Sequence, residues 1–437
     1  MAQLGICALL LFYFLFSGLV HHIKSHTQKQ HKPHKLDRPN FIIILADDIG
    51  WGDLWVKRPH NSTPTPWLDS LREKGKRHGL RNGVTHNFAV GSVGGLPIKE
   101  ITLAQVLHDS GYYTAMIDTL IFTERKVLFN RKHEQCYSKV PLPLFENETI
   151  VEQPLDTWSL KERYAAAAVK QIKTSVSRKQ PFLLYVALAH MHVPLFHNPF
   201  FNVTTQDPYT ASLSDMDSLV GTIMEAVSTE QLENTLIWFT GGGSAKRTTW
   251  EGGHRVPTVV AWPKKIKPNS TSNALLSGMD IFPTILSLVG VKPPSDRHYD
   301  GIDITDILLN DSNSGHKSIM HPNSGAAGQF GDLQTVRLKH HKAFYVTGGS
   351  EACGGGSGQQ HYHHPPLIFD LSRDEAEEAP LNPDSDEYRT VLREVEKESA
   401  ALLLDIATDN VSTANYRKDP AAVPCCQNLI CRCHSLK

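Results

Sequence analysis

Apolar runs of strand length alternate with helical patterns from Asn40 onward, and this alternation constrains the fold more than any other feature. The clearest runs are "FIIILA" at 41–46, "FLLYVAL" at 182–188, "TLIWFT" at 235–240 and "TVVAW" at 258–262. The helical patterns lie at 101–110, 159–177 and 214–227. Because each apolar run is continuous rather than alternating, both faces of the sheet must be covered. The sequence therefore predicts an α/β fold, a mostly parallel sheet with helices on both faces.

A smaller domain is expected after about residue 300, where the pattern changes. Residues 349–366, "GSEACGGGSGQQHYHHPP", predict a long loop, "PLIFDLSRD" predicts a short strand, and 386–410 predict an amphipathic helix. We therefore expect the α/β domain at 39–300 and a C-terminal α+β domain at 301–437, which ends in a cysteine-rich tail.

The first 20 residues, "MAQLGICALLLFYFLFSGLV", are typical of a secretory signal peptide, because their apolar stretch is too short to span a bilayer comfortably. No Lys or Arg precedes that stretch, which leaves an uncleaved anchor as the alternative. No other segment approaches the ~18 apolar residues that a stable membrane span needs. Residues 21–38 are polar and rich in histidine, which favours a flexible leader over a weak metal-binding tract.

Glycosylation sequons and cysteines agree with a secreted protein. The sequons are at Asn61, Asn147, Asn202, Asn269, Asn310 and Asn410. Outside the signal peptide the cysteines are Cys136, Cys353, Cys425, Cys426, Cys431 and Cys433. In an oxidising compartment the tail "CCQNLICRC" predicts local disulfides, and a zinc knuckle is the alternative.

The charge balance excludes partners that are bound through a broad electrostatic field. The chain has 44 basic and 45 acidic residues and a formal net charge of −1. Such a chain has no general attraction to nucleic acid or to an acidic membrane surface. Any charged ligand must therefore be held by a local group of side chains.

Two adjacent carboxylates, Asp47 and Asp48, follow the first apolar run directly. In an open parallel sheet, ligands bind beyond the carboxyl ends of the strands. Two neighbouring carboxylates repel each other unless a cation or a basic group lies between them. The pair therefore predicts a site for a hard divalent ion, and an exposed acidic turn is the plainer alternative.

Basic side chains follow other strands of the same predicted sheet. His190 and His192 come just after 182–188, and Lys246 and Arg255 lie in the glycine-containing loop before 258–262. Taken singly, such a histidine is more often structural and such a lysine more often lies on the surface. Together with a metal ion, they would suit an anionic, oxygen-rich substrate, because charge that develops on oxygen must be stabilised.

Four stretches in this order, "RPNFIIILADDIGWGDL", "PFLLYVALAHMHVP", "TTWEGGHRVP" and "MDIFPTILSLVG", resemble the sulfatase family. The similarity runs from about residue 38 to the C-terminal cysteines. It implies a fold similar to alkaline phosphatase, a bound Ca²⁺ ion, and hydrolysis of sulfate esters of aryl compounds or of glycosaminoglycan sugars in the lysosome.

The resemblance also implies roles for single residues. They are Asp47 and Asp48 as calcium ligands, His192 and Lys246 as sulfate contacts, and His190 and Arg255 as supporting residues behind them. In the family, the nucleophile is a formylglycine made by oxidation of the cysteine in a CxPSR motif.

This chain lacks three functional blocks of the family. The CxPSR motif should follow the helix that contains "WLDSLREKGKR", but the sequence continues directly with "HGLRNGVTH". A "GKWHLG" element should follow "YYTAMI", and an Asp and an Asn that complete the calcium site should follow "TLIWFTG". The flanking sequences stay close to the family, which indicates loss of whole segments rather than gradual drift.

We therefore expect the chain as written to be inactive. Formylglycine cannot form in it, and the formylglycine-generating enzyme is not expected to act on it. Calcium affinity should be weakened, and apolar surface should be exposed where elements are missing, so misfolding and retention in the endoplasmic reticulum are the alternative fate. If relatives pair a cysteine near Cys353 with one in a missing segment, Cys353 has a free thiol.

Two other functions compete with that of a sulfuric ester hydrolase. The first is a catalytically silent relative that binds sulfated glycans or a protein partner through the same residues. The second is a two-metal phosphatase or phosphodiesterase, which would need a Ser or Thr nucleophile and more His and Asp ligands than the spacing offers.

Overall fold

The computed structural model falls into two compact units, Met1–Arg38 and Pro39–Lys437, and all elements discussed below belong to the second. The structure describes residues 38–51, 54, 92–97, 99–118, 144–146, 149–152, 155–192, 195, 207–230, 232–242, 248–323, 329–350, 358–408 and 414–419.

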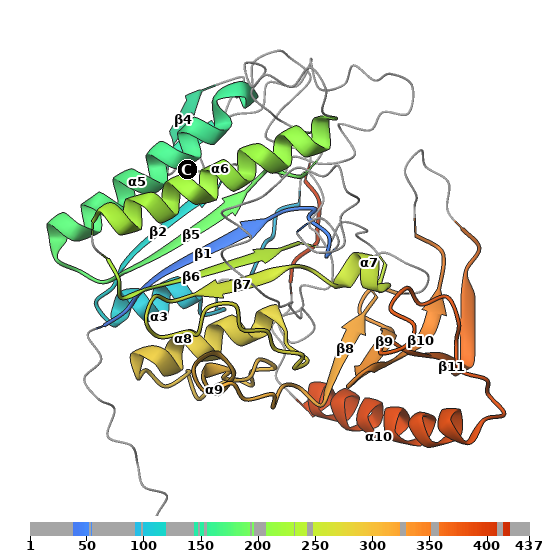
Figure 1. Ribbon diagram of the computed structural model, residues 1–437. Helices are drawn as coiled ribbons and strands as arrows, with labels where there is room; N and C mark the ends of the chain where they lie inside the picture. Colours follow the sequence, from blue (N-terminus) through green and yellow to red (C-terminus); the bar gives the residue numbers. More distant parts are fainter. Residues whose placement is uncertain are drawn as a thin grey trace, which may run out of the picture. The chain divides into compact units, whose positions relative to one another are not determined.

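A five-stranded sheet lies between two groups of helices (Figure 1). In spatial order its strands are β2 (Tyr113–Asp118), β5 (Phe182–Leu188), β1 (Asn40–Ala46), β6 (Thr235–Gly241) and β7 (Thr258–Ala261). β1 is central and runs parallel to both neighbours, so Ile44 lies opposite Val186 of β5 and Phe239 of β6. The predicted α/β fold class, a mostly parallel sheet with helices on both faces, is confirmed.

The two faces of the sheet are buried by different helices. One face is covered by α5 (Leu160–Arg178) and α6 (Pro208–Thr229), and the other by α3 (Leu103–Asp109), α8 (Ile281–Val289) and α9 (Thr305–Asn310). Successive side chains of β1 alternate between them: Ile42 and Ile44 pack in the core with α5 and α6, and Phe41 and Ile43 in the core with α3 and α8. Burial on both faces explains the continuous apolar run of β1.

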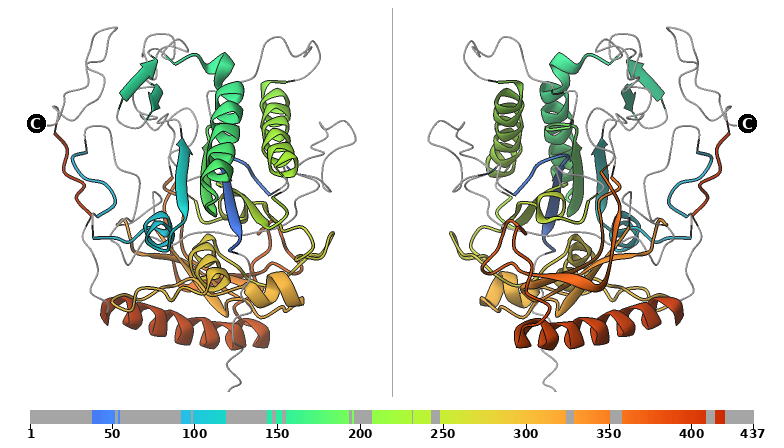
Figure 2. Two further views of the ribbon diagram at one scale, coloured as in Figure 1. Left: turned by 90° about the vertical axis from the view of Figure 1, so that its left-hand side faces the viewer. Right: turned by 90° about the vertical axis from the view of Figure 1, so that its right-hand side faces the viewer.

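The C-terminal region forms a separate antiparallel sheet, in agreement with the predicted α+β texture. In spatial order its strands are β11 (His361–Asp370), β10 (His341–Thr347), β9 (Leu333–Leu338) and β8 (Ser318–Pro322). The long helix α10 (Asp386–Thr408) packs on one face through Tyr388, Val391 and Val395 (Figure 2). The division of the chain at residue 300 stays a prediction.

β7 runs antiparallel to β6 as the edge strand of the main sheet, a direction that the prediction of a mostly parallel sheet left open. Two expectations about single elements were wrong. Residues 361–366, expected in a loop, form the exposed start of β11. The stretch has no apolar strand pattern, and it is a strand because Tyr362 pairs with Val346 of β10. α6 begins at Pro208 rather than at 214, because the Asp207 side chain accepts hydrogen bonds from the N–H groups of Tyr209 and Thr210.

Several short elements complete the described structure. They are the hairpin of β3 (Leu144–Glu146) and β4 (Thr149–Glu152), the helix α7 (Glu251–His254), and single 3₁₀ turns at Thr157–Ser159 and Gly278–Asp280. Among the described helices, none has the length and apolarity to cross a bilayer.

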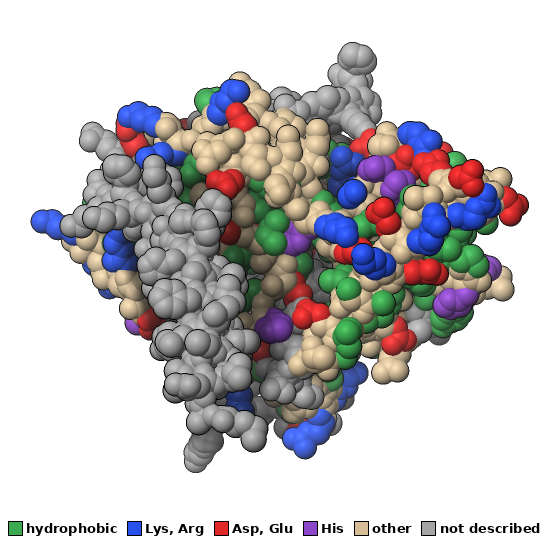
Figure 3. Space-filling model, turned by 90° about the horizontal axis from the view of Figure 1, so that it is seen from below, with side chains coloured by type: hydrophobic (Ala, Val, Ile, Leu, Met, Phe, Trp, Pro, Cys, Tyr) green, Lys and Arg blue, Asp and Glu red, His purple; other side chains and the backbone are tan. Residues whose placement is uncertain are grey.

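The surface reflects the even charge balance of the chain. Acidic and basic side chains are interspersed on the face shown in Figure 3. The largest apolar exposure in the main sheet is on its edge strand β2, where Met116 is 63% exposed.

Candidate functional site

Asp47 and Asp48 lie where β1 leaves the sheet at its carboxyl end. The Gly242 N–H donates a hydrogen bond to the Ala46 carbonyl at 2.7 Å, which holds the end of β6 beside this turn. A Cβ at Gly242 would lie 3.2 Å from Asp47 Oδ1, so glycine permits the close approach of backbone and carboxylate. Asp48 has a φ of 55°, and its N–H donates to Asp47 Oδ1 at 3.1 Å. Aspartate tolerates this left-handed conformation better than most residues.

His192 reaches the same two carboxylates from the neighbouring strand β5. A turn after β5 contains Met191 with a φ of 75°, and the His192 N–H donates to the Ala189 carbonyl at 3.2 Å. His192 Nε2 then lies 3.6 Å from Asp48 Oδ2 and 4.0 Å from Asp47 Oδ2. The structure therefore brings together three of the four residues for which direct contact with the metal or the sulfate was expected. We call Asp47, Asp48 and His192 the rim.

The fourth residue, Lys246, lies outside the described residues. Arg255, which follows it in the same loop, does not extend to the carboxylates of the rim. Its guanidinium lies over the Trp51 ring, 4.3 Å from the centroid, and forms an ion pair with Glu375. Because Trp51 follows Asp48 by three residues, this contact ties the turn after β1 to the C-terminal region.

His190 is held apart from the rim and packs behind it. Its side chain is 2% exposed, and its ring lies 5.9 Å from that of Tyr164 on α5. Burial, together with the smaller effect of the positive charge of Lys161, lowers the pKa of His190 to about 4. The Tyr164 hydroxyl donates to the Ala187 carbonyl at 3.0 Å and accepts from the Ala189 N–H at 3.1 Å. This neutral, buried contact fixes the end of β5 from which His192 extends.

The donor set of the rim fits a hard divalent cation. Asp47 and Asp48 offer carboxylate oxygens, and their side chains are 25% and 12% exposed. Carboxylate oxygens of this kind are the ligands that Ca²⁺ and Mg²⁺ prefer. A bound cation would stabilise the adjacent carboxylates and would attract an anionic group to the place that His192 borders.

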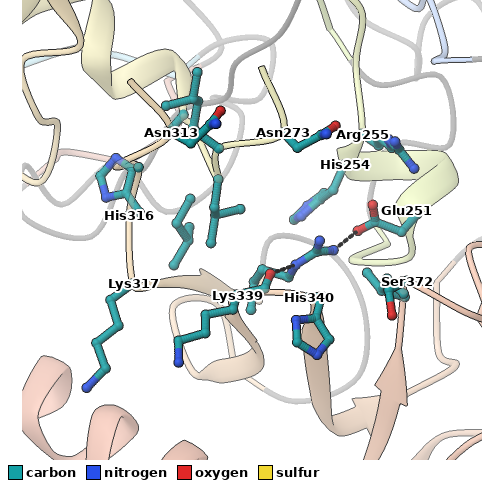
Figure 4. A pocket seen from close by; sticks show the side chains of 18 of the residues that line it. Glu251, His254, Arg255, Asn273, Asn313, His316, Lys317, Lys339, His340 and Ser372 are labelled. Carbon is teal, nitrogen blue, oxygen red and sulfur yellow. Dashed lines mark hydrogen bonds and ion pairs between the residues drawn. The ribbon is translucent and has the colours of Figure 1, made fainter. Parts of the chain in front are cut away.

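A second group of polar residues lies in a cavity of about 640 Å³ between α7 and the C-terminal sheet (Figure 4). Its lining includes several basic side chains, among them His254, His316, Lys317, Lys339 and His340. Sequence reasoning missed this cavity because its walls come from segments far apart in the chain. The stretch "TTWEGGHRVP", which contributes α7, was the one part of it that the sequence indicated.

Comparisons with known proteins agree with this architecture. Residues 77–291 match the family model described as "Sulfatase", and residues 314–434 match "C-terminal region of aryl-sulfatase". A solved sulfatase structure from Pseudoalteromonas sp. superposes with a TM-score of 0.72 at 20% identity, covering 86% of this chain and 92% of that one. At this identity the match shows the fold alone.

Closer relatives are found among curated sequences. Arylsulfatase G from Rattus norvegicus is 41% identical over 517 residues, which cover 97% of this chain and 98% of the relative. Arylsulfatase A from Homo sapiens is 30% identical and covers 78% of this chain and 82% of the relative. The aligned stretch of 517 residues exceeds the 437 residues of this chain, so internal segments of arylsulfatase G have no counterpart here. The chain belongs to the sulfatase family and is similar to arylsulfatase G.

Proposed function

We propose that this chain binds a divalent cation and a sulfated ligand at the rim but does not hydrolyse the sulfate ester. Hydrolysis of sulfate esters is the chemistry of the family to which the chain belongs. The observation that carries the proposal is the convergence of Asp47, Asp48 and His192 at one end of the sheet, in a chain without a CxPSR sequence.

The cation is expected to be Ca²⁺, bound less tightly than in a complete sulfatase. Asp47 and Asp48 supply two carboxylates, whereas Ca²⁺ takes six to eight oxygen ligands. The Asp and Asn that would follow β6 in the family are replaced by "GGSAKR". Water must therefore fill much of the coordination shell. When bound, the cation supplies positive charge that neutralises sulfate oxygens.

The ligand is expected to be an aryl sulfate or a sulfated glycosaminoglycan sugar. His192 would donate a hydrogen bond to a sulfate oxygen, and Lys246 would add a positive charge. Buried His190 supports the turn that presents His192 and does not itself contact the ligand. A lysosomal location agrees with the similarity to arylsulfatase G, with the leader of the chain and with its sequons.

Turnover should be absent because no side chain replaces the missing nucleophile. Hydrolysis in the family proceeds through a covalent intermediate, and removal of such a nucleophile commonly costs a factor on the order of 10⁶ in rate. Metal and basic side chains alone would polarise the sulfate without forming the bond that divides the reaction into two easier steps.

A chromogenic aryl sulfate tests turnover directly. Purified glycoprotein in Ca²⁺ should release no chromophore above a blank without enzyme, while arylsulfatase G assayed beside it should. The matched variant is this chain with the CxPSR segment of arylsulfatase G restored, made together with the formylglycine-generating enzyme. Chromophore release by the unaltered chain would refute the proposed inactivity.

Calorimetry with the same aryl sulfate tests binding. The unaltered chain should bind it in Ca²⁺, and both His192→Gln and Asp48→Asn should weaken binding at least tenfold. If neither substitution changes the affinity, the rim is not the binding site. If no sulfated ligand binds at all, the surviving alternative is recognition of a protein partner.

A further inference from the structure

Two imidazoles and one carboxylate converge at one end of the C-terminal sheet. His340 and His341 lie at the turn that leads into β10, and His341 is opposite Asp370, the last residue of β11. One potential ligand atom from each of these three residues lies within 4.8 Å of the other two. The centroids of the two imidazole rings are 4.2 Å apart. None of these residues belongs to the rim.

The His341 side chain provides a second observation that points to a ligand. Its Nε2 atom is buried and forms no hydrogen bond within the part of the chain that the structure describes. Glu387 Oε1 of α10 lies 3.9 Å from this nitrogen, which is beyond hydrogen-bond reach. Buried polar atoms in proteins almost always have a partner, so this nitrogen calls for an explanation.

The carboxylate of Asp370 is already held in one orientation. Its Oδ1 accepts hydrogen bonds from the Ser372 N–H at 3.0 Å and the Ser372 hydroxyl at 2.6 Å, and its Oδ2 accepts one from Arg373 Nε at 2.5 Å. The Leu371 N–H donates to the His340 carbonyl at 2.8 Å, which fixes the backbone of His340 beside the end of β11. Carboxylates that bind metals are typically supported by hydrogen bonds of this kind.

We propose that His340, His341 and Asp370 form a binding site for a divalent transition metal ion of the zinc class. Two imidazole nitrogens and one carboxylate oxygen suit Zn²⁺ better than Ca²⁺, which prefers oxygen ligands. Water would complete the coordination shell, or Glu387 would do so on leaving its ion pair with Arg373.

The geometry requires a small movement, and the structure shows where it can occur. Ligand atoms of a tetrahedral zinc ion are roughly 3.4 Å apart, because each lies about 2.0–2.1 Å from the metal. The side chain of His340 is 51% exposed, and it borders the cavity of Figure 4. Rotation of this exposed side chain, with a smaller adjustment of the partly buried His341, would bring the ligand atoms together beside the carboxylate of Asp370.

Isothermal titration of the full chain with Zn²⁺ tests the site. The histidine-rich leader, the cysteine-rich tail and the rim add background binding that is the same in every variant, so the measured quantity is the one equivalent of Zn²⁺ by which wild type and variant differ. Wild-type protein should bind this equivalent at least tenfold more tightly than His340→Ala, and excess Ca²⁺ should not displace it. Since the side chain of His340 is half exposed, the variant should melt at the same temperature as wild type without zinc.

The matched control is the double variant His361→Ala/His364→Ala, which removes two exposed imidazoles from the same sheet. This control should keep the tight equivalent. As a second measurement, His341→Gln should lose it, and Zn²⁺ should raise the melting temperature of wild type more than that of either ligand variant. Equal zinc affinity in wild type and His340→Ala, loss in the control, or displacement by Ca²⁺ would each overturn the proposal.

Discussion

The rim and the contact between α7 and the C-terminal sheet both contain opposite charges, but they arrange them differently. At the rim, His192 Nε2 lies 3.6 and 4.0 Å from two partly exposed carboxylates. At the other contact, Lys342 is fully buried, and its Nζ lies 2.9 Å from both Glu251 and Glu377. We call Glu251, Lys342 and Glu377 the buried triad.

The charged groups of the triad are paired with one another inside the protein. The Glu251 N–H also donates to Glu377 Oε2 at 2.6 Å, and Trp250, the preceding residue, packs 4.2 Å from the Phe344 ring. These contacts link the loop after β6 to β10. A buried charge is tolerated only when it is paired within the protein, whereas a partly exposed charge remains accessible to a ligand. We therefore expect the triad to serve folding, and the rim to serve the binding proposed above.

The largest effect is expected when the triad is broken. Lys342→Met should lower the free energy of unfolding by about 3–5 kcal/mol, because it leaves Glu377 without its buried cation and Glu251 with only Arg337. Chemical denaturation measures this, with the exposed Lys397→Ala as the matched control, expected within about 0.5 kcal/mol of wild type. A loss below about 1 kcal/mol for Lys342→Met would remove the contrast between the two regions.

The next effect concerns the buried histidine behind the rim. Because the pKa of His190 falls from 6.5 when unfolded to about 4 when folded, the unfolded chain binds more protons between these values. Stability should therefore decline as the pH falls below about 6.5, reaching a loss of roughly 3 kcal/mol near pH 4. The nearby charged groups are Lys161, which adds to the shift, and Glu162, which opposes it.

His190→Phe isolates this contribution. Its unfolding free energy, measured between pH 7 and 4, should fall less steeply than that of wild type, since the phenyl ring has no proton to bind. Parallel curves for the two proteins would show that His190 does not titrate in this way.

A smaller effect is expected at a second buried cluster whose polar groups have partners within the protein, near the start of α8. The fully buried Asp280 accepts hydrogen bonds from the N–H groups of Ser277 at 2.7 Å and Ile302 at 2.9 Å, and His316 Nε2 lies 2.7 Å from its Oδ1. His316→Ala should cost about 1–2 kcal/mol of unfolding free energy, because it leaves this oxygen with one partner fewer.

The exposed pair of His298 and Asp405, 3.6 Å apart, offers the control for this prediction. In the same denaturation experiment, His298→Ala should change stability by less than about 0.5 kcal/mol. Equal losses for the two histidine variants would mean that the buried contact of His316 with Asp280 stabilises the protein no more than the surface pair of His298 and Asp405.

The smallest effect on stability is expected at the rim itself. Asp48→Asn should change the free energy of unfolding by less than about 0.5 kcal/mol or raise it slightly, because it removes repulsion between adjacent carboxylates. Asparagine also accepts the φ of 55° found at this position. A loss comparable to that of Lys342→Met would show that the rim charges hold the fold together.

The sequence predicted the elements that have strong local patterns. Continuous apolar runs identified β1, β5 and β6, and parallel order placed Asp47 and His192 at the same end of the sheet. The antiparallel direction of β7 depends on the connection after β6, which the run itself does not encode. The start of β11 has no apolar pattern, because its side chains face solvent and backbone pairing alone makes it a strand.

Clusters built from distant segments could not be predicted. From the sequence alone, Lys342 would be predicted to lie on the surface. Only the packing of α7 against β10 makes it a buried cation. Likewise, adjacent histidines at a turn gain meaning only once Asp370 is placed beside them. Local sequence patterns determine the strands and their ends. Three-dimensional packing determines which charged side chains are paired inside the protein.

Thermal unfolding with and without Ca²⁺ tests most directly whether the charged side chains of the rim bind a ligand. The wild-type melting temperature should rise with Ca²⁺ concentration, as for any ligand that binds only the folded state. The double variant Asp47→Asn/Asp48→Asn should melt at nearly the same temperature as wild type without Ca²⁺ and should not respond to it. An equal rise in both proteins, or a calcium-free variant that melts far below wild type, would contradict this account.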